Sequence, residues 1–278
     1  MTLGLCTTVP FNMGGCADTT GALGSMIGGE QGKGIGNALG HGVDAQTLSE
    51  RDERAMGQSV AMQVTSRFRL VSDPKVSQYV VLVGLSLVSS SPRPDGNWFF
   101  AVIEDDQPNA FSGPDGYIFV TRGALKQMRD ESELAGVLAH EMTHVLQHHG
   151  LNAAKQSGTY SAFIEGGNAA MQANQQNAQF LSMVNSAGDV VLVKGYDRGQ
   201  EDQADAGAVK LLSAAGYDPT GYLNFLSRVA DEQRGGSRNA AFSTHPDAAS
   251  RVAKVQKQLT TVPKGGAVLK DRFERMTK

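Results

Sequence analysis

Residues 138–146 read Leu-Ala-His-Glu-Met-Thr-His-Val-Leu, and this stretch decides the fold that we expect. Apolar residues recur around it with helical spacing, which predicts an amphipathic helix whose apolar side is formed by Leu134, Val137, Leu138 and Val145. Asp130, with Glu133 three residues later, is the pattern of a capping box at the start of this helix. Gly150 is expected to end it.

The two histidines of this stretch are four residues apart. On a helix, four residues return to nearly the same side, about 40° around and roughly 6 Å along the axis, so His140 and His144 can bind one metal ion. Glu141 projects beside that ion, where a carboxylate can accept a proton from activated water and pass it to a leaving amine. A solvated helix that carries histidines by chance is the alternative.

A catalytic zinc site needs a third protein ligand and an open position for water. Glu201 is our candidate, because it opens a second helical run that ends at Gly216. Asp205 follows one turn later and suits the carboxylate that accepts the other N–H of a metal-bound imidazole, which we assign to His140. An acidic first turn that complements the helix dipole would explain both carboxylates without a metal.

Small residues predict that these two helices pack closely. Gly136 lies on the same stripe as the histidines, where its missing side chain lets another backbone approach. The second run contains a cluster of small residues after its glutamate, namely Ala204, Ala206, Gly207 and Ala208.

Several segments, in this order, make the chain resemble a known group of enzymes: Gln107–Phe111, Gly116–Gly123, Ala139–His144, Glu201–Asp205, and Thr244–Pro246 with Arg251. Over roughly residues 44 to 256 the chain resembles the gluzincin endopeptidases of the CAAX-prenyl-protease and HtpX type, especially their soluble bacterial periplasmic members. The resemblance implies a zincin-like metallopeptidase fold of the α+β class. Such a fold is mainly helical, with a small mixed or antiparallel sheet whose edge borders the active-site cleft.

The resemblance also implies a role for each site residue. One Zn²⁺ per chain would be bound by His140, His144 and Glu201, with Glu141 as the catalytic base. Asp205 would be the carboxylate that orients a ligand.

Two further residues match positions of the family's motifs, but each has two possible roles. His245 looks like the family's auxiliary catalytic histidine, which either visits the open metal position or stabilises the oxyanion. Arg251 either faces the oxyanion or makes a salt bridge, and we favour the salt bridge. His148 and His149 compete as ligands, but no carboxylate stands between them at the useful position, so we assign them to helix capping or solvent.

Short β-rich runs at 98–103 and 117–120 predict a small sheet. In metallopeptidases of this shape, an edge strand binds an extended substrate through main-chain hydrogen bonds. Our candidates for this substrate-binding edge are Asn109, Ala110 and Phe111. The alternative is a core hairpin with Phe111 buried, and the two interpretations are compatible.

The remaining helices are predicted at 48–70, 74–88, 218–233 and 247–259. Segment 153–193 is rich in Gln, Asn, Ala and Gly and lies between the two ligand segments. It is either a lid over the cleft or a simple helical excursion.

We divide the chain into a glycine-rich, flexible N-terminal segment (1–43), a single zinc metallopeptidase domain (44–261) and a C-terminal tail (262–278). A hydrophobic content of 40% is enough for a sizeable core, and a net charge of −3 gives no reason to invoke nucleic acid. No apolar run is long enough for a transmembrane segment.

The two cysteines, Cys6 and Cys16, both lie in the N-terminal segment. Met13-Gly-Gly-Cys16 faintly resembles the end of a lipoprotein signal, so a lipid anchor at Cys16, a disulfide and two free thiols all remain open. The family resemblance implies the bacterial periplasm, or attachment to a membrane through the N-terminus.

The expected function is therefore zinc-dependent endopeptidase activity in envelope protein quality control, with unfolded or misassembled envelope proteins as substrates. The alternative is a latent or non-catalytic, chaperone-like binding protein of the envelope that contains zinc. The fourth metal ligand discriminates between them, because water indicates a catalytic site and a side chain indicates a closed one.

Overall fold

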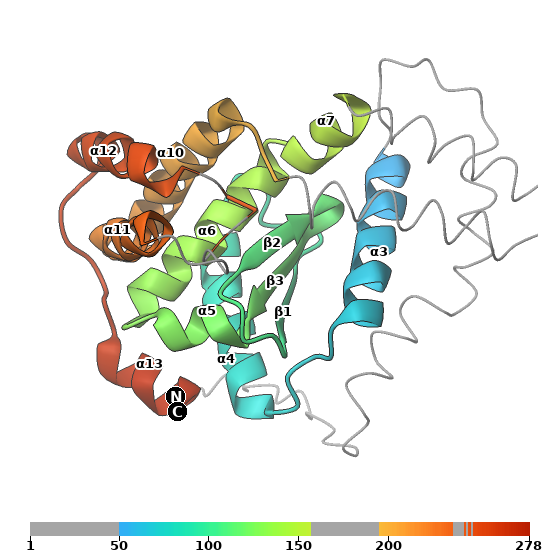
Figure 1. The fold of residues 1–278 in the computed structure, drawn as a ribbon, viewed down its shortest axis with the longest axis horizontal. Helices are drawn as coiled ribbons and strands as arrows, with labels where there is room; N and C mark the ends of the chain where they lie inside the picture. Colours follow the sequence, from blue (N-terminus) through green and yellow to red (C-terminus); the bar gives the residue numbers. More distant parts are fainter. Residues whose placement is uncertain (1–49, 157–194, 236–241, 243, 246) are drawn as a thin grey trace, which may run out of the picture.

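The computed structural model describes residues 50–156, 195–235, 242, 244, 245 and 247–278 (Figure 1). The helices and strands, in chain order, are α3 (Glu50–Arg67), α4 (Pro74–Val88), β1 (Phe99–Ile103), β2 (Ala110–Gly113), η1 (Pro114–Gly116), β3 (Tyr117–Thr121), α5 (Arg122–Gln127), α6 (Glu131–Leu146), α7 (His149–Gln156), α10 (Arg198–Ala214), α11 (Thr220–Arg234), α12 (Ala248–Gln258), η3 (Leu259–Thr261) and α13 (Lys270–Thr277).

Three parts of the sequence predictions lie outside the described residues. They are the flexible segment at 1–43, both cysteines, and all but the first residues of the lid candidate. Among the helices that are described, none combines the length and apolar composition needed to cross a membrane.

The sheet has three strands in the order β1-β3-β2. β1 runs parallel to β3, with Phe99 opposite Tyr117, and β2 runs antiparallel to β3, with Ala110 opposite Val120. Among the residues that the structure describes, β2 therefore has a sheet partner on one side only and is an edge strand. The prediction of a mainly helical α+β fold with a small mixed sheet is confirmed.

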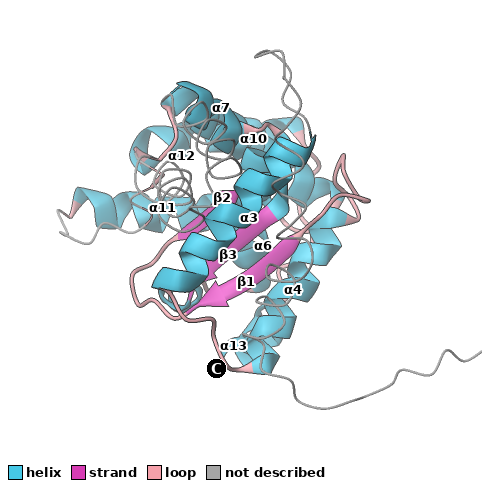
Figure 2. Ribbon diagram, turned by 90° about the vertical axis from the view of Figure 1, so that its right-hand side faces the viewer, coloured by secondary structure: helices cyan, strands magenta, loops and turns pink. Residues whose placement is uncertain are grey.

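The two faces of the sheet pack against different helices. Figure 2 shows α3 across one face and α6 behind the other. Because side chains alternate along a strand, Phe111 and Phe119 join the cluster with α3, whereas Ala110 and Ile118 join the core that contains α4 and α6. Phe111 is thus buried, as one of the two compatible interpretations required.

Helix α6 begins at the predicted cap but ends earlier than predicted. Asp130 caps the helix by accepting a hydrogen bond from Glu133 N at 3.1 Å, but the Glu133 side chain accepts from Arg129 N instead of completing the box. The helix ends before Gly150, which lies inside α7. The chain turns at His148, which has a left-handed φ of 54°, so the predicted end at Gly150 was wrong.

The prediction of close helix packing is confirmed. A Cβ added to Gly207 on α10 would lie 2.3 Å from Thr143 Cγ2 on α6, and one added to Gly136 would lie 3.0 Å from Tyr222 Cα on α11. Helices α10 and α11 therefore both lie directly on α6, on the side away from the sheet (Figure 1).

The C-terminal residues, which we named a tail, form α13 and pack on the domain. Phe273 is buried beside Tyr79 of α4, with ring centroids 6.4 Å apart. Arg272 pairs with the buried Glu131 at the start of α6, which also accepts hydrogen bonds from Tyr79 at 2.8 Å and Tyr217 at 2.7 Å. This charged helix thus contributes to the same core as α6.

Candidate active site

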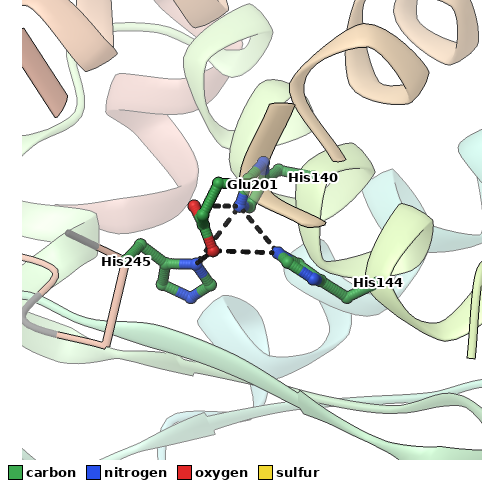
Figure 3. Close-up of side chains that lie close together, drawn as sticks. All are labelled: His140, His144, Glu201 and His245. Carbon is green, nitrogen blue, oxygen red and sulfur yellow. Dashed lines mark hydrogen bonds and ion pairs between the residues drawn. The ribbon is translucent and has the colours of Figure 1, made fainter. Parts of the chain in front are cut away.

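Four potential metal ligands from three segments converge in the interior (Figure 3). His140 and His144 come from α6, Glu201 from the first turn of α10, and His245 from the segment between α11 and α12. Their ligand atoms all lie within 4.8 Å of one another. The Nε2 atoms of the two α6 histidines are 3.0 Å apart, and each is 3.5 Å from an oxygen of Glu201.

The chemistry of these donors fits a divalent cation. His140 Nδ1 lies 3.2 Å from Asp205 Oδ1, and His144 Nδ1 lies 2.9 Å from His149 Nδ1. With the Nδ1 hydrogens directed to these acceptors, both Nε2 atoms present lone pairs to each other and to a carboxylate. Ligands at about 2.0–2.2 Å in a tetrahedron lie roughly 3.3–3.6 Å apart, close to the spacings observed.

His245 lies at the fourth corner of this group. Its Nδ1 is 2.9 Å from Glu201 Oε1 and 3.3 Å from His140 Nε2, while its Nε2 is 3.1 Å from Glu141 Oε1. Burial alone would lower the pKa of His245, but the carboxylates of Glu201 and Glu141 raise it to about 10. In this geometry Nδ1 of His245 lies where a fourth metal ligand would lie, and it could bind a metal ion only after losing the hydrogen that it directs to Glu201.

Glu141 is buried and fixed by a residue that the sequence analysis missed. Its Oε2 accepts a hydrogen bond from Ser112 Oγ at 2.8 Å. Burial would raise the pKa of Glu141, but His245 and the Ser112 hydroxyl hold it below its usual value, so the carboxylate is ionised. Ser112 lies on the same side of β2 as Ala110, two residues earlier. Only this alternation of side chains along the strand could have predicted from the sequence that Ser112 faces the site.

Arg251 makes the salt bridge that we favoured. Its Nε and Nη2 donate to the two oxygens of Asp205 at 2.9 and 2.6 Å, and its Nη1 is 2.6 Å from Glu201 Oε2. Asp205 also accepts a hydrogen bond from Tyr222 at 2.6 Å. Burial would raise the pKa of Asp205, but the guanidinium holds it well below its usual value. All three guanidinium nitrogens therefore contact carboxylates on α10.

His149 is not at a solvated helix end, and our assignment of it was wrong. Its side chain is buried, and its Nε2 lies 2.9 Å from Gln203 Oε1 on α10. The left-handed turn at His148 directs the next residue back toward the site. His148 itself is half exposed and lies 3.2 Å from Glu53 Oε1, as expected for a residue outside the ligand set.

The outer edge of β2, our candidate for substrate binding, is lined by the chain's own residues. Phe111 is not brought to the site, because its side chain packs on the α3 side of the sheet. Three hydrogen bonds join the residues at this edge to the segment that carries the fourth donor: Phe242 N donates to Pro108 O at 2.8 Å, Thr244 Oγ1 to Asn109 Oδ1 at 3.1 Å, and His245 Nε2 to Ala110 O at 3.3 Å.

Comparisons with known proteins agree with this site. The sequence model of peptidase family M48 matches residues 74–259, a range that contains every candidate site residue. The chain is 30% identical over 212 residues to a beta-barrel assembly-enhancing protease of Yersinia pestis, a match that covers 74% of this chain and 44% of that protein.

Two further relatives differ in how much of their length is matched. The mitochondrial metalloendopeptidase OMA1 of Schizosaccharomyces pombe is 30% identical over 211 residues, with 74% of this chain and 61% of that protein covered. The metalloprotease YcaL of Escherichia coli is 25% identical over 221 residues, with 78% and 84% covered. The chain thus spans less than half the length of the Yersinia protein and most of YcaL.

Proposed function

We propose that this chain, which belongs to the metallopeptidase family M48, is a zinc-dependent endopeptidase that acts in protein quality control of the bacterial cell envelope. One observation carries the proposal: two helical histidines and a carboxylate from another helix form a buried donor group, with Glu141 directly beside it. This is the His₂Glu donor set of catalytic zinc sites.

Each residue of the site has a task in peptide hydrolysis. A zinc ion held by His140, His144 and Glu201 would supply a Lewis acid and lower the pKa of water to about 7. Glu141, ionised at neutral pH, takes the proton of the attacking water and returns it to the leaving amine. Ser112 holds one oxygen of Glu141, so the other oxygen is directed to the donor group.

An extended polypeptide is the substrate that the edge of β2 supports best. Of the three candidates, Ala110 has its carbonyl on the outer edge, where His245 contacts it, whereas both main-chain groups of Asn109 bond Thr121 on β3. An extended substrate that displaced His245 would gain main-chain hydrogen bonds along this edge with little demand on sequence, which suits unfolded or misassembled proteins. The name of the Yersinia relative refers to beta-barrel assembly and supports an envelope role for this chain. We place the protein in the periplasm or at a membrane, with Cys16 as the candidate lipid anchor.

A second candidate function is a latent or non-catalytic zinc protein that binds polypeptides, as a chaperone does. It is favoured by His245, which lies at the fourth donor position and also contacts the edge that a substrate would use. The His245→Ala variant separates the two roles of this histidine. If His245 closes the site, its removal raises peptidase activity. If it stabilises the oxyanion, its removal lowers kcat by about 100-fold or more.

The proposed function is tested by zinc quantification together with digestion of an unfolded protein such as reduced casein. The wild type should bind one zinc per chain and cleave casein, whereas Glu141→Gln should keep the zinc and lose cleavage. Glu232→Gln, an exposed change on α11, is the control and should behave as the wild type. Cleavage at the wild-type rate by Glu141→Gln would defeat the assignment.

A further inference from the structure

We infer that His149 and Gln203 are positioning residues that determine which ring nitrogen of His144 carries a hydrogen and thereby keep His144 Nε2 available for the metal. The inference rests on the proposed function, since it takes His144 as a metal ligand. It gives a task to the buried histidine that the sequence analysis had placed at a solvated helix end.

The hydrogen-bond chain can be followed atom by atom. Gln203 Oε1 lies 2.9 Å from His149 Nε2, and an amide oxygen can only accept, so Nε2 carries the hydrogen. The Nδ1 of a neutral His149 is then bare and can only accept. It lies 2.9 Å from His144 Nδ1, which must therefore donate. With its hydrogen on Nδ1, His144 directs a lone pair from Nε2 toward His140 and Glu201.

If every donor and acceptor in the Gln203–His149–His144 hydrogen bonds were reversed, His144 could not bind a metal ion. If Gln203 presented its amide nitrogen, His149 Nε2 would accept and Nδ1 would donate. His144 Nδ1 would then be bare and its Nε2 would carry a hydrogen, directed at the space between the donors. A ring nitrogen that carries a hydrogen cannot bind a metal ion, so the amide oxygen must face His149 in the metal-binding state.

These hydrogen bonds also explain why α10 is central to the site. Glu201 on this helix is a ligand, Asp205 bonds directly to His140, and Gln203 reaches His144 through His149. One helix thus orients both histidines of α6. The two partners differ in strength, because Asp205 is a charged acceptor whereas Gln203 is neutral.

A second contact, independent of this hydrogen bond, also restricts the ring of His144. Tyr196 stacks on it, with centroids 4.0 Å apart and an angle of 15° between the rings. Stacking fixes the plane of the imidazole but does not distinguish its two nitrogens. The bond to His149 supplies that distinction, so loss of His149 should affect the metal rather than the fold.

The test measures zinc affinity by competition with a chromophoric chelator. Partners of this kind typically contribute 10–100-fold to metal affinity, so His149→Phe, which keeps a ring without nitrogens, should bind zinc at least about tenfold more weakly. Gln203→Leu should weaken binding severalfold. It also guards against a failure of His149→Phe to fold, because Gln203 is exposed on α10.

Two matched variants separate hydrogen bonding from packing. Gln203→Glu keeps an accepting oxygen and adds a charge to it, so this variant should bind zinc at least as tightly as the wild type. His148→Asn changes the neighbouring histidine, whose half-exposed side chain contacts Glu53, and should leave affinity unchanged. Unfolding midpoints of the metal-free variants should all lie close to the wild type.

Wild-type zinc affinity in both His149→Phe and Gln203→Leu would overturn the inference. Weaker binding in Gln203→Glu, equal to that in Gln203→Leu, would also overturn it, since the effect would then not depend on the acceptor. These results leave the proposed function intact, because that function is tested separately by the zinc content and casein cleavage of the wild type and by the loss of cleavage in Glu141→Gln.

Discussion

Replacement of Gly207 by alanine should separate the two helices that hold the metal ligands. An added Cβ would lie 2.3 Å from Thr143 Cγ2, 2.6 Å from its Oγ1 and 3.0 Å from its Cβ. Carbon atoms in contact prefer about 3.5–4.0 Å. Rotation of the threonine moves its methyl and hydroxyl but not its Cβ, so α10 must retreat from α6 by roughly 0.5–1 Å.

The magnitude has two parts. Overpacking of this kind typically costs about 1–3 kcal/mol, and alanine regains about 1 kcal/mol over glycine inside a helix, which leaves a net destabilisation of up to about 2 kcal/mol. The loss of zinc affinity should be more pronounced than the loss of stability. Ligand distances must hold within about 0.2 Å, and Glu201 moves with α10, so zinc affinity should fall at least tenfold.

Urea unfolding of the metal-free protein and chelator competition measure these two effects. Gly199→Ala is the matched control on the same helix, because a Cβ there meets, among the described residues, only Asp197 Oδ1 at 3.2 Å. The second change Thr143→Ala should restore part of the lost affinity in Gly207→Ala. The reasoning is refuted if Gly207→Ala is as stable as Gly199→Ala and binds zinc as tightly as the wild type.

Three further predictions follow from the contacts around α6. Arg251→Met removes the guanidinium that pairs with the buried Asp205 and Glu201 and should destabilise the metal-free protein by about 3–5 kcal/mol in urea unfolding, with zinc restoring part of the loss; equal loss with and without zinc would contradict this. Ser112→Ala should lower kcat for casein severalfold with KM unchanged, because the hydroxyl contacts Glu141; a change in KM alone would argue against a positioning role. Arg272→Met should destabilise the protein at pH 7. The pKa of Glu131 is held below its usual value by the guanidinium and two tyrosine hydroxyls, which outweigh burial, so this stabilisation is present above about pH 4.5 and is lost as the pH falls. The difference from the wild type in unfolding midpoint should therefore shrink below that pH, and a constant difference would contradict the account.

The parts of the fold that depend on local sequence were predictable. Helix α6 is signalled by its apolar spacing and by Asp130, and α10 by its acidic first turn and the glycine that ends it. That Glu201 lies beside His140 and His144 is not a local property. We predicted it because a catalytic zinc site needs a third protein ligand and because the chain resembles a known family.

The residues that were missed depend on contacts between distant segments. His149 faces the site because His148, a non-glycine residue, adopts a left-handed φ. Residue propensities for helix, strand or turn do not predict that conformation at a histidine. Ser112 reaches Glu141 only because β2 pairs with β3 in one register. Helix α13 is short and highly charged, so its signal was weak, and its place depends on a buried aromatic ring and a distant glutamate.

Anomalous diffraction from crystals of the zinc-loaded Glu141→Gln variant tests the central claim most directly, because this variant keeps every proposed ligand but cannot turn over substrate. We predict one zinc peak per chain, within about 2.3 Å of His140 Nε2, His144 Nε2 and a carboxylate oxygen of Glu201. A peak bound elsewhere, or one bound to the histidines with Glu201 beyond coordination distance, would contradict the account.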